Sequence, residues 1–287
     1  MPVKGNNLFC PSCNKSQSQI NLIDCEYCGH DLGAPNVNIV STETELTALQ
    51  GRYDNAMEYA IKSDKVDQLK NFENFFNNNV NGIINLSLHV LEAWIIQSGA
   101  YKSYHRAIGD KLRTIAIPSN DQKRTVLNSV IHGTYGRDMI YAALTLNCQG
   151  LTSYGNCSVI LDEQAIESRA TTLEENSYTF IKTHNLNLEK LEIPPGYRSN
   201  WQNKIKLAVA KLHKKINQDS NEKDFCEMIL FSDGKRNGED FIEVHVYKEI
   251  TNFAIKIIYI PKSNNRREEL VIKAIEEKCP GKVIRTE

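Results

Sequence analysis

Three short segments between residues 130 and 180 decide the fold that we expect for this chain. They read V-I-H-G-T-Y-G at Val130–Gly136, Q-G-L-T-S-Y-G at Gln149–Gly155, and R-A-T-T-L-E-E-N-S-Y-T-F at Arg169–Phe180. The β-branched run C-S-V-I-L at Cys157–Leu161 follows the second segment and is typical of a short strand. We expect these segments to line one cleft, which Glu243 completes from a strand much later in the chain.

The composition limits the classes of protein that fit. The chain has 287 residues, enough for one large domain and a small one, and a net charge of −1. A near-neutral chain carries no global electrostatic signature of nucleic-acid binding, so any basic surface is local. No apolar run approaches the roughly 18 residues of a membrane span, and the N-terminus M-P-V-K-G-N-N lacks the apolar stretch of a signal peptide. We therefore expect a cytoplasmic protein without a membrane segment.

Four of the eight cysteines form two C-x2-C pairs with an 11-residue spacer. In the cytosol such pairs hold a metal more often than they form disulfides, although a redox-active pair is the alternative. Four thiolates suit tetrahedral Zn²⁺, and a unit of about 30 residues needs a metal to supply its folding energy. We predict a zinc ribbon at residues 1–35 with the ligands Cys10, Cys13, Cys25 and Cys28.

The sequence indicates the role of the ribbon less clearly than its metal ligands. Zinc ribbons grip nucleic acid, dock a protein partner or close off a chain end. This one has few basic residues, Lys4 and Lys15, so docking a partner or a structural role is favoured over nucleic-acid binding.

Residues 42–120 read as a helical connector after a Gly-, Pro- and Asn-containing linker at Leu32–Thr44. Apolar residues recur at helical spacing from Leu46 to Lys70, and a helix that is apolar nearly all round, hence buried, is predicted at Ile83–Gln97. A third, short helix is predicted at Tyr101–Leu112.

Residues 121–287 alternate between strand and helix patterns, and we predict an α+β domain here. Strands are expected at Val126–Thr134 (running into a loop), Cys157–Leu161, Phe225–Ser232, Phe241–Tyr247, Phe253–Ile260 and Val283–Ile284. Helices are expected at Asp138–Cys148 (ended by Gly150), Glu163–Ser168, Trp201–Ile216 and Asn264–Lys278.

The order of the motifs resembles the ADP-ribosyltransferase superfamily, in its diphtheria-toxin-like and polymerase-like branch. His132-Gly133-Thr134 at a strand end, Tyr154-Gly155 before a strand and a glutamate on a distant strand carry the resemblance, which covers Val126–Ile260. Arg169-Ala170-Thr171 and Asn176-Ser177 also look like segments of bacterial and phage members. The resemblance implies a split central sheet and transfer of ADP-ribose from NAD⁺ to a protein or nucleic acid, with release of nicotinamide. A toxin, an anti-phage effector or a regulatory modifier would use this activity.

Glu243 is the expected catalytic carboxylate. Cleavage of the nicotinamide–ribose bond develops oxocarbenium character, which a carboxylate stabilises more in the transition state than in the ground state. Alternation places Glu243 on the outward face of its strand with Phe241, His245 and Tyr247, while Ile242, Val244 and Val246 face the core. The alternative is an ordinary solvated strand residue.

The resemblance also implies the residues that bind NAD⁺. His132 would hydrogen-bond a ribose hydroxyl, and the Gly133-Thr134 backbone would approach the nicotinamide amide. Tyr154 or Tyr178 would stack on the nicotinamide, and Arg169 would pair with the phosphates. Core packing for the tyrosines and a structural ion pair for Arg169 are the alternatives.

Two features limit the acceptor. Arginine-modifying members carry Glu or Gln two residues before the catalytic Glu, and Phe241 stands there, so arginine modification is disfavoured. His245 on the same face would act on the acceptor instead, and a packed surface histidine is the alternative. The other function that we consider is a non-catalytic nucleic-acid-binding protein on a degenerate transferase scaffold. It would use the ribbon and the lysines Lys204, Lys206, Lys211, Lys214 and Lys215. Hydrolysis of NAD⁺ without an acceptor is a third possibility.

Overall fold

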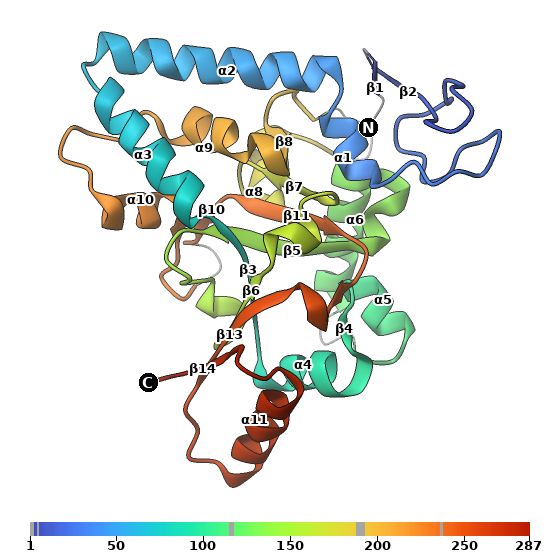
Figure 1. Ribbon diagram of the computed structural model, residues 1–287, viewed down its shortest axis with the longest axis vertical. Coiled ribbons are helices and arrows are strands. Elements are labelled where there is room, and N and C mark those ends of the chain that lie inside the picture. The colour runs from blue at the N-terminus through green and yellow to red at the C-terminus, as the bar shows by residue number, and fades with distance from the viewer. Residues whose placement is uncertain (1–2, 5, 115–117, 188–192, 236–237) are drawn as a thin grey trace.

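A computed structural model of the chain describes residues 3–4, 6–114, 118–187, 193–235 and 238–287. The fold is mixed α/β, and helices cover both faces of a central sheet (Figure 1). The sheet has eight strands in the order β14-β13-β6-β3-β5-β11-β7-β8. All neighbours are antiparallel except the parallel pair β13 and β14. The predicted mixture of helices and strands is confirmed, whereas membership of the transferase fold stays a prediction.

The main sheet consists of β3 (Asn81–Leu86), β5 (Met139–Thr145), β6 (Cys157–Leu161), β7 (Ala170–Leu173), β8 (Arg198–Asn200), β11 (Glu243–Tyr247), β13 (Ile255–Pro261) and β14 (Val283–Thr286). The short strands are β1 (Val3–Lys4), β2 (Asn7–Leu8), β4 (Ala100–Tyr101), β9 (Leu230–Phe231), β10 (Asp240–Phe241) and β12 (Ile250–Thr251). The α-helices are α1 (Pro35–Val40), α2 (Glu43–Lys62), α3 (Val66–Asn79), α4 (Leu88–Glu92), α5 (Tyr104–Gly109), α6 (Pro118–His132), α7 (Glu163–Ile166), α8 (Ser177–Thr183), α9 (Lys204–Leu212), α10 (Glu222–Ile229) and α11 (Arg266–Lys278).

Strand β3 joins two halves of the sheet. It pairs with β5 only through Asn81–Ile83 and with β6 through Ile83–Leu86, so its two ends serve different neighbours. The half that contains β5, β11, β7 and β8 is therefore attached to the other half over a short ladder.

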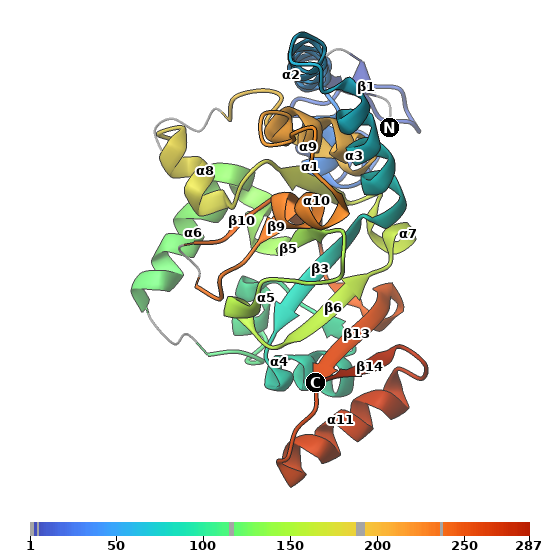
Figure 2. The same ribbon diagram turned by 90° about the vertical axis from the view of Figure 1, so that its left-hand side faces the viewer.

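The faces of β11 pack against different layers of helices. Val244 and its neighbours Ile242 and Val246 join the main core, to which α2, α3, α9 and α10 contribute buried apolar side chains. On the other face a smaller cluster unites Ile131 of α6 with Leu173 of β7 and Phe180 of α8. Figure 2 shows α6 and α8 on one side of the strands and α3 and α9 on the other. The sheet around β11 is thus buried on both faces.

Two similar turns build the N-terminal cysteine unit. The carbonyl of Cys10 accepts a hydrogen bond from the Asn14 N–H, and the carbonyl of Cys25 accepts one from the Gly29 N–H, each at 2.9 Å. Asn14 and Gly29 both adopt positive φ, 56° and 69°. Glycine takes this conformation without strain, which suits Gly29 to the turn after the second pair. The unit extends to one side of the molecule and leads directly into α1 (Figure 1).

Several predicted elements are wrong in type. Val126–Thr134 belongs to α6 and the 3₁₀ turn Gly133–Asp138 rather than to a strand, and Asp138–Cys148 contains strand β5 rather than a helix. Phe225–Ser232 is a strand only at β9 (Leu230–Phe231), because its first five residues belong to α10, whose first turn is capped by Asn221. The expected linker Leu32–Thr44 contains α1.

The segment predicted as a helical connector, residues 42–120, is not helical throughout. It supplies β3 to the centre of the sheet, where a buried helix at Ile83–Gln97 was expected, and then α4 and a π-helical turn at Ala93–Ser98. The third predicted helix, Tyr101–Leu112, is the shorter α5. The connector and the following segment therefore share one sheet, and the division into domains stays a prediction.

The remaining strand and helix predictions at the C-terminal side are confirmed. β6, β11, β13 and β14 lie within or beside their predicted ranges, as do α7, α9 and α11. Within the ranges that the structure describes, no helix has the length and apolarity to cross a membrane.

Candidate functional site

A buried polar cluster lies on one face of β11. Glu243 and His245 share this face, as predicted, and are only 5% and 3% exposed. The prediction that this face points to solvent is wrong, because α6 and α8 cover it. Burying a carboxylate and an imidazole in a sheet is costly unless both are hydrogen-bonded, so their partners identify the site.

Donors from the start of α8 and from His245 hold the Glu243 carboxylate. Oε2 accepts hydrogen bonds from the Ser177 backbone N–H at 2.9 Å, from the Ser177 hydroxyl, and contacts His245 Nε2 at 2.9 Å. Oε1 has a longer contact of 3.4 Å with Asn176 Nδ2. Asn176 also caps α8, because its side chain accepts from the Tyr178 N–H. Oε1 is thus the carboxylate oxygen with spare accepting capacity among the described contacts.

Two further rings extend the cluster beyond His245. The His132 ring, at the end of α6, lies 4.6 Å from the His245 ring between centroids, and the Tyr141 ring lies 5.0 Å from it. Tyr141 stands opposite His245 in the β5–β11 register and donates its hydroxyl to Asn128 of α6. Burial, and then the Glu243 charge, raise the pKa of Tyr141 well above its usual value, so Tyr141 is a neutral hydroxyl at pH 7.

His132 is buried in its neutral form. Burial is the main reason that its pKa is well below the usual value, and the charges of His245 and Arg198 act in the same direction. Its Nε2 is buried and has no hydrogen-bond partner among the described residues. A neutral, pre-positioned and unpartnered imidazole is available to a polar ligand.

Ser177, His245 and Glu243 do not form a nucleophilic triad. In such a triad the acid contacts one imidazole nitrogen and the hydroxyl contacts the other. Here the Ser177 hydroxyl, at 3.3 Å, and the Glu243 carboxylate both contact His245 Nε2. The arrangement therefore holds a carboxylate in place rather than activating a serine.

A cavity of about 10 Å³ adjoins the cluster, lined in part by Asn36, His132, Thr171, Arg198 and His245. This volume accommodates about one water molecule, so a larger ligand needs a movement of the covering elements. A larger pocket of about 580 Å³ lies elsewhere, around Asp219, Glu227 and Phe231.

Some of the residues predicted to bind nicotinamide are sequence neighbours of the cluster, whereas Tyr154 is not. Gly133 is exposed directly after His132, with φ of +60°, and Thr134 beside it is exposed. Tyr178 follows Ser177 and is 56% exposed, whereas Tyr154 lies in the 3₁₀ turn Thr152–Tyr154 and is 38% exposed. Tyr178 is thus the tyrosine on the helix that holds Glu243.

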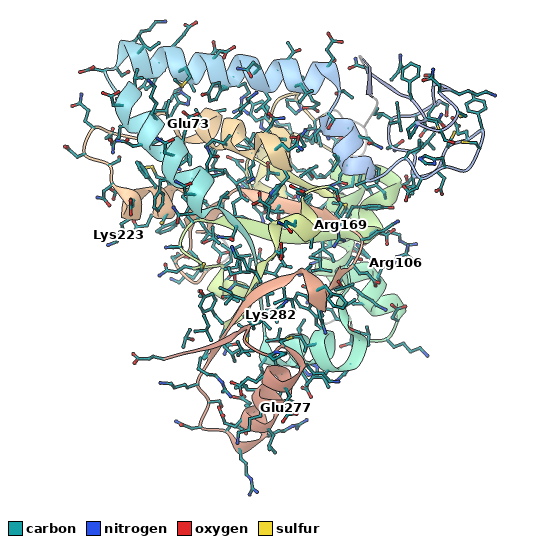
Figure 3. All side chains as sticks on the ribbon, in the orientation of Figure 1. Glu73, Arg106, Arg169, Lys223, Glu277 and Lys282 are labelled. Atoms are coloured by element: carbon teal, nitrogen blue, oxygen red, sulfur yellow. The ribbon has the colours of Figure 1, made fainter. Side chains whose placement is uncertain are left out.

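Arg169 binds main-chain carbonyls in this structure. Its Nη1 donates to the carbonyls of Tyr247 and Glu249 at 2.8 Å, and to that of Lys248 at 3.3 Å. Lys248 has a positive φ of 63°, so the guanidinium stabilises the tight turn after β11. Figure 3 labels Arg169 at this end of the strands. Its predicted contact with a phosphate stays a prediction.

The four predicted metal ligands converge on one point. The Sγ atoms of Cys10, Cys13, Cys25 and Cys28 all lie within 4.8 Å of one another. The pairs Cys10–Cys28 and Cys13–Cys25 are each separated by 3.6 Å. A tetrahedral Zn²⁺ with Zn–S bonds of about 2.3 Å requires S–S edges of about 3.8 Å, so the four thiols fit such an ion. The cluster can hold a metal such as zinc.

The lysine-rich face predicted for residues 201–216 is neutralised only in part. Lys204 pairs with Glu163 at 3.0 Å, and Lys211 and Lys215 both pair with Asp240, at 2.5 and 2.7 Å. Lys206 donates to Gln50. Engaged lysines offer less charge to a polyanion, so the rival nucleic-acid-binding hypothesis gains no support from this helix.

Sequence reasoning missed four side chains of the site. They are Asn36, Asn128, Tyr141 and Arg198. The four-residue spacing of Asn128 and His132 would have placed both on one face of a helix, had this segment been read as a helix. No comparable signal in the sequence marks Asn36 or Arg198. Comparison with protein-family models gives no match, and comparison with curated proteins finds no similar sequence.

Proposed function

We propose that the chain cleaves the nicotinamide–ribose bond of NAD⁺ and transfers ADP-ribose to a macromolecular acceptor. One observation supports the proposal most. Three segments chosen from sequence as parts of one site, those with His132, with Asn176-Ser177 and with Glu243, meet at His245 and Glu243. They come from α6, α8 and β11, which are far apart in the chain. A shared functional site explains why sequence reasoning and geometry select the same segments.

Glu243 would stabilise the positive charge that develops on the ribose. The donors on Oε2 fix the carboxylate, which leaves Oε1 to face the sugar. Fixed charges in a water-poor site stabilise a transition state more strongly than the same charges in water, because they do not have to reorient. Burial of the cluster favours such a role once NAD⁺ is bound.

His132 would position the substrate rather than transfer a proton. Its lowered pKa keeps the ring neutral at pH 7, so it donates or accepts one hydrogen bond without adding charge beside the ribose. The exposed Tyr178, next to Ser177, would stack on the part of the substrate that extends to the surface.

The experiment is to measure nicotinamide release from NAD⁺ by the purified full-length chain, with and without cell lysate as a source of acceptors. We expect release, and transfer of label from NAD⁺ to protein or nucleic acid. Glu243→Gln keeps the shape of the side chain but removes its charge. It should slow release by about 10²- to 10³-fold, the effect of removing one electrostatic partner of a transition state.

Glu249→Gln is the matched control. Glu249 is an exposed glutamate just beyond β11, and its side chain has no part in the cluster. We expect its variant to cleave NAD⁺ at the normal rate. Equal rates for folded Glu243→Gln and the natural chain would disprove the catalytic role of Glu243. Free ADP-ribose as the only product would instead indicate hydrolysis.

We also infer that the four-cysteine unit binds Zn²⁺ with a structural role. The four thiols complete a tetrahedron and leave no ligand position for a substrate, which is the arrangement of structural rather than catalytic zinc. Elemental analysis of the purified chain should give about one zinc per chain. Substitution of the four cysteines by serine should remove it.

A further inference from the structure

Asn36 of α1 places a primary carboxamide against the main chain of the candidate site. Its Nδ2 donates to the carbonyl of Arg169 at 3.1 Å, to the Thr171 hydroxyl at 3.2 Å and to the carbonyl of His245 at 3.2 Å. Two N–H groups are therefore shared among three acceptors. The side chain is 3% exposed, so α1 inserts this amide into the fold rather than laying it on the surface.

The other end of the same carboxamide is unsatisfied. Asn36 Oδ1 is buried and has no hydrogen-bond partner among the described residues, and the same holds for His132 Nε2. Both residues line the cavity of about 10 Å³ beside the Glu243 cluster. A buried carbonyl oxygen without a donor destabilises the closed position of Asn36, so another carboxamide whose oxygen finds a donor would suit this position better.

We propose that Asn36 occupies a binding site for a primary carboxamide, and that the nicotinamide amide of NAD⁺ takes this site when α1 withdraws, instead of the Gly133-Thr134 backbone that the resemblance implies. The inference rests on the proposed function. The acceptors Arg169 O, Thr171 Oγ1 and His245 O suit the NH₂ group of an amide. His132 Nε2, the other atom beside the cavity without a partner among the described residues, would donate to the oxygen of an amide that reaches closer to it than Asn36 Oδ1 does. A carboxylate such as nicotinic acid has no proton for the three acceptors.

The position agrees with the chemistry of the cluster. His245 links the two halves of the site, because its carbonyl accepts from Asn36 and its ring contacts Glu243. A nicotinamide held by its amide at Asn36's position would therefore direct its ring nitrogen and ribose toward Glu243, one side-chain step along β11. α1 must leave first, since the cavity holds only about one water.

The cysteine unit is attached to the helix that has to move. Ile23 of the unit packs with Ala34 and with Val37 of α1 against Tyr135 and Tyr247. The contacts that hold the cysteine unit in place therefore also hold α1 in place. A partner that displaces the unit would displace α1 and open the carboxamide site.

The test uses thermal unfolding of the zinc-loaded full chain with saturating nicotinamide or nicotinic acid. Asn36→Ala removes the internal amide and weakens the hold on α1. We expect nicotinamide to raise the Tm of this variant by a few degrees, as a ligand that binds only the folded state does, and nicotinic acid to have no effect. Asn38→Ala is the matched control, because Asn38 is equally buried on the same helix but lies outside the site. Neither ligand should change its Tm.

Asn36→Ser is measured in the same way, so that the test remains decisive if Asn36→Ala does not fold. A nicotinamide shift that is no larger for the Asn36 variants than for Asn38→Ala would overturn the inference. NAD⁺ cleavage by the same variants separates the two proposals. We expect Asn36→Ala to cleave NAD⁺ on the order of tenfold faster than the natural chain. The reason is that the closed position of α1 loses the hydrogen bonds of the Asn36 amide, so the open state becomes more populated.

Nicotinamide binding to Asn36→Ala without NAD⁺ cleavage by any variant would contradict the proposed function and leave the carboxamide site standing. Cleavage by the natural chain without selective nicotinamide binding to the Asn36 variants would do the reverse.

Discussion

Replacing Glu45 with alanine should destabilise the chain more than any ordinary surface substitution. Glu45 lies in the first turn of α2 with its side chain only 7% exposed. Its carboxylate accepts from the Gly196 N–H at 2.8 Å and from Arg198 through Nε at 2.7 Å and Nη2 at 2.6 Å. Since Arg198 also lines the cavity beside His132, this ion pair connects α2 to the candidate site.

The magnitude follows from what the substitution leaves behind. The Arg198 side chain is 18% exposed, so it would lose its partner while remaining largely buried. Breaking a buried ion pair from one side costs about 3–5 kcal/mol. At about 2–3 °C per kcal/mol for a chain of this size, Glu45→Ala should lower the Tm by about 6–15 °C.

The assay is thermal unfolding followed by circular dichroism, with Glu58→Ala as the control in the same helix. Glu58 pairs with Lys62 at 3.4 Å, but the two side chains are 65% and 76% exposed. Such a pair contributes less than about 0.5 kcal/mol, so the control should melt within about 1–2 °C of the natural chain. Adding Arg198→Leu to Glu45→Ala should recover part of the loss, because no unpaired charge then remains. Similar melting of Glu45→Ala and Glu58→Ala would refute the reasoning.

Three other predictions concern pH, metal and backbone. The pKa of His132 is lower in the folded chain than in the unfolded chain, so the unfolded chain binds the extra proton as the pH falls. The free energy of unfolding should therefore decrease below about pH 6.5, by up to about 1.4 kcal/mol per pH unit. Urea unfolding at pH 7.5 and 5.5 should show a smaller difference in stability for His132→Gln than for the natural chain. Chelation of the metal should unfold the cysteine unit while the far-ultraviolet circular dichroism of the sheet and helices largely persists, because the unit's small core of Leu8, Cys10, Cys25 and Leu32 is separate from the main core; a cooperative loss of the whole signal would contradict this. Gly155→Ala should reduce the soluble yield, because φ is +155° and a Cβ would overlap the backbone of Leu86. Gly51→Ala within α2 has open space for its Cβ, so urea unfolding should show a stability higher by up to about 1 kcal/mol.

The sequence predicts elements best where a segment has one buried face. Strand β13, with exposed Lys256 between buried Ile255 and Ile258, and helix α11 show such patterns and are confirmed. Met139–Thr145 is apolar except for the hydroxyls of Tyr141 and Thr145, and it is buried nearly throughout, because it lies in mid-sheet with helices on both faces. A continuous apolar run does not distinguish a strand from a buried helix, and its alanines favour the helical interpretation.

The candidate site shows a different limit. Alternation along β11 correctly places Glu243 and His245 together, because side-chain direction is a local property of a strand. What covers that face depends on α6, about 110 residues earlier, and on α8, and no local pattern records such contacts. Arg198 and Asn36 enter the site for the same reason, from elements that only the folded chain brings near β11.

The burial of the cluster itself implies a closed state. A site for a dinucleotide needs a volume far above the roughly 10 Å³ beside His132, yet its polar groups are already aligned by Ser177, Asn176 and Asn36. For the proposed enzyme, this arrangement would be a pre-organised but covered active site. The free energy needed to open such a site lowers the apparent affinity for the substrate. α1, a helix of six residues between the cysteine unit and α2, is the element whose withdrawal the carboxamide proposal requires. If the proposed function holds, control of activity would then act through the cysteine unit, without any change to the Glu243 carboxylate.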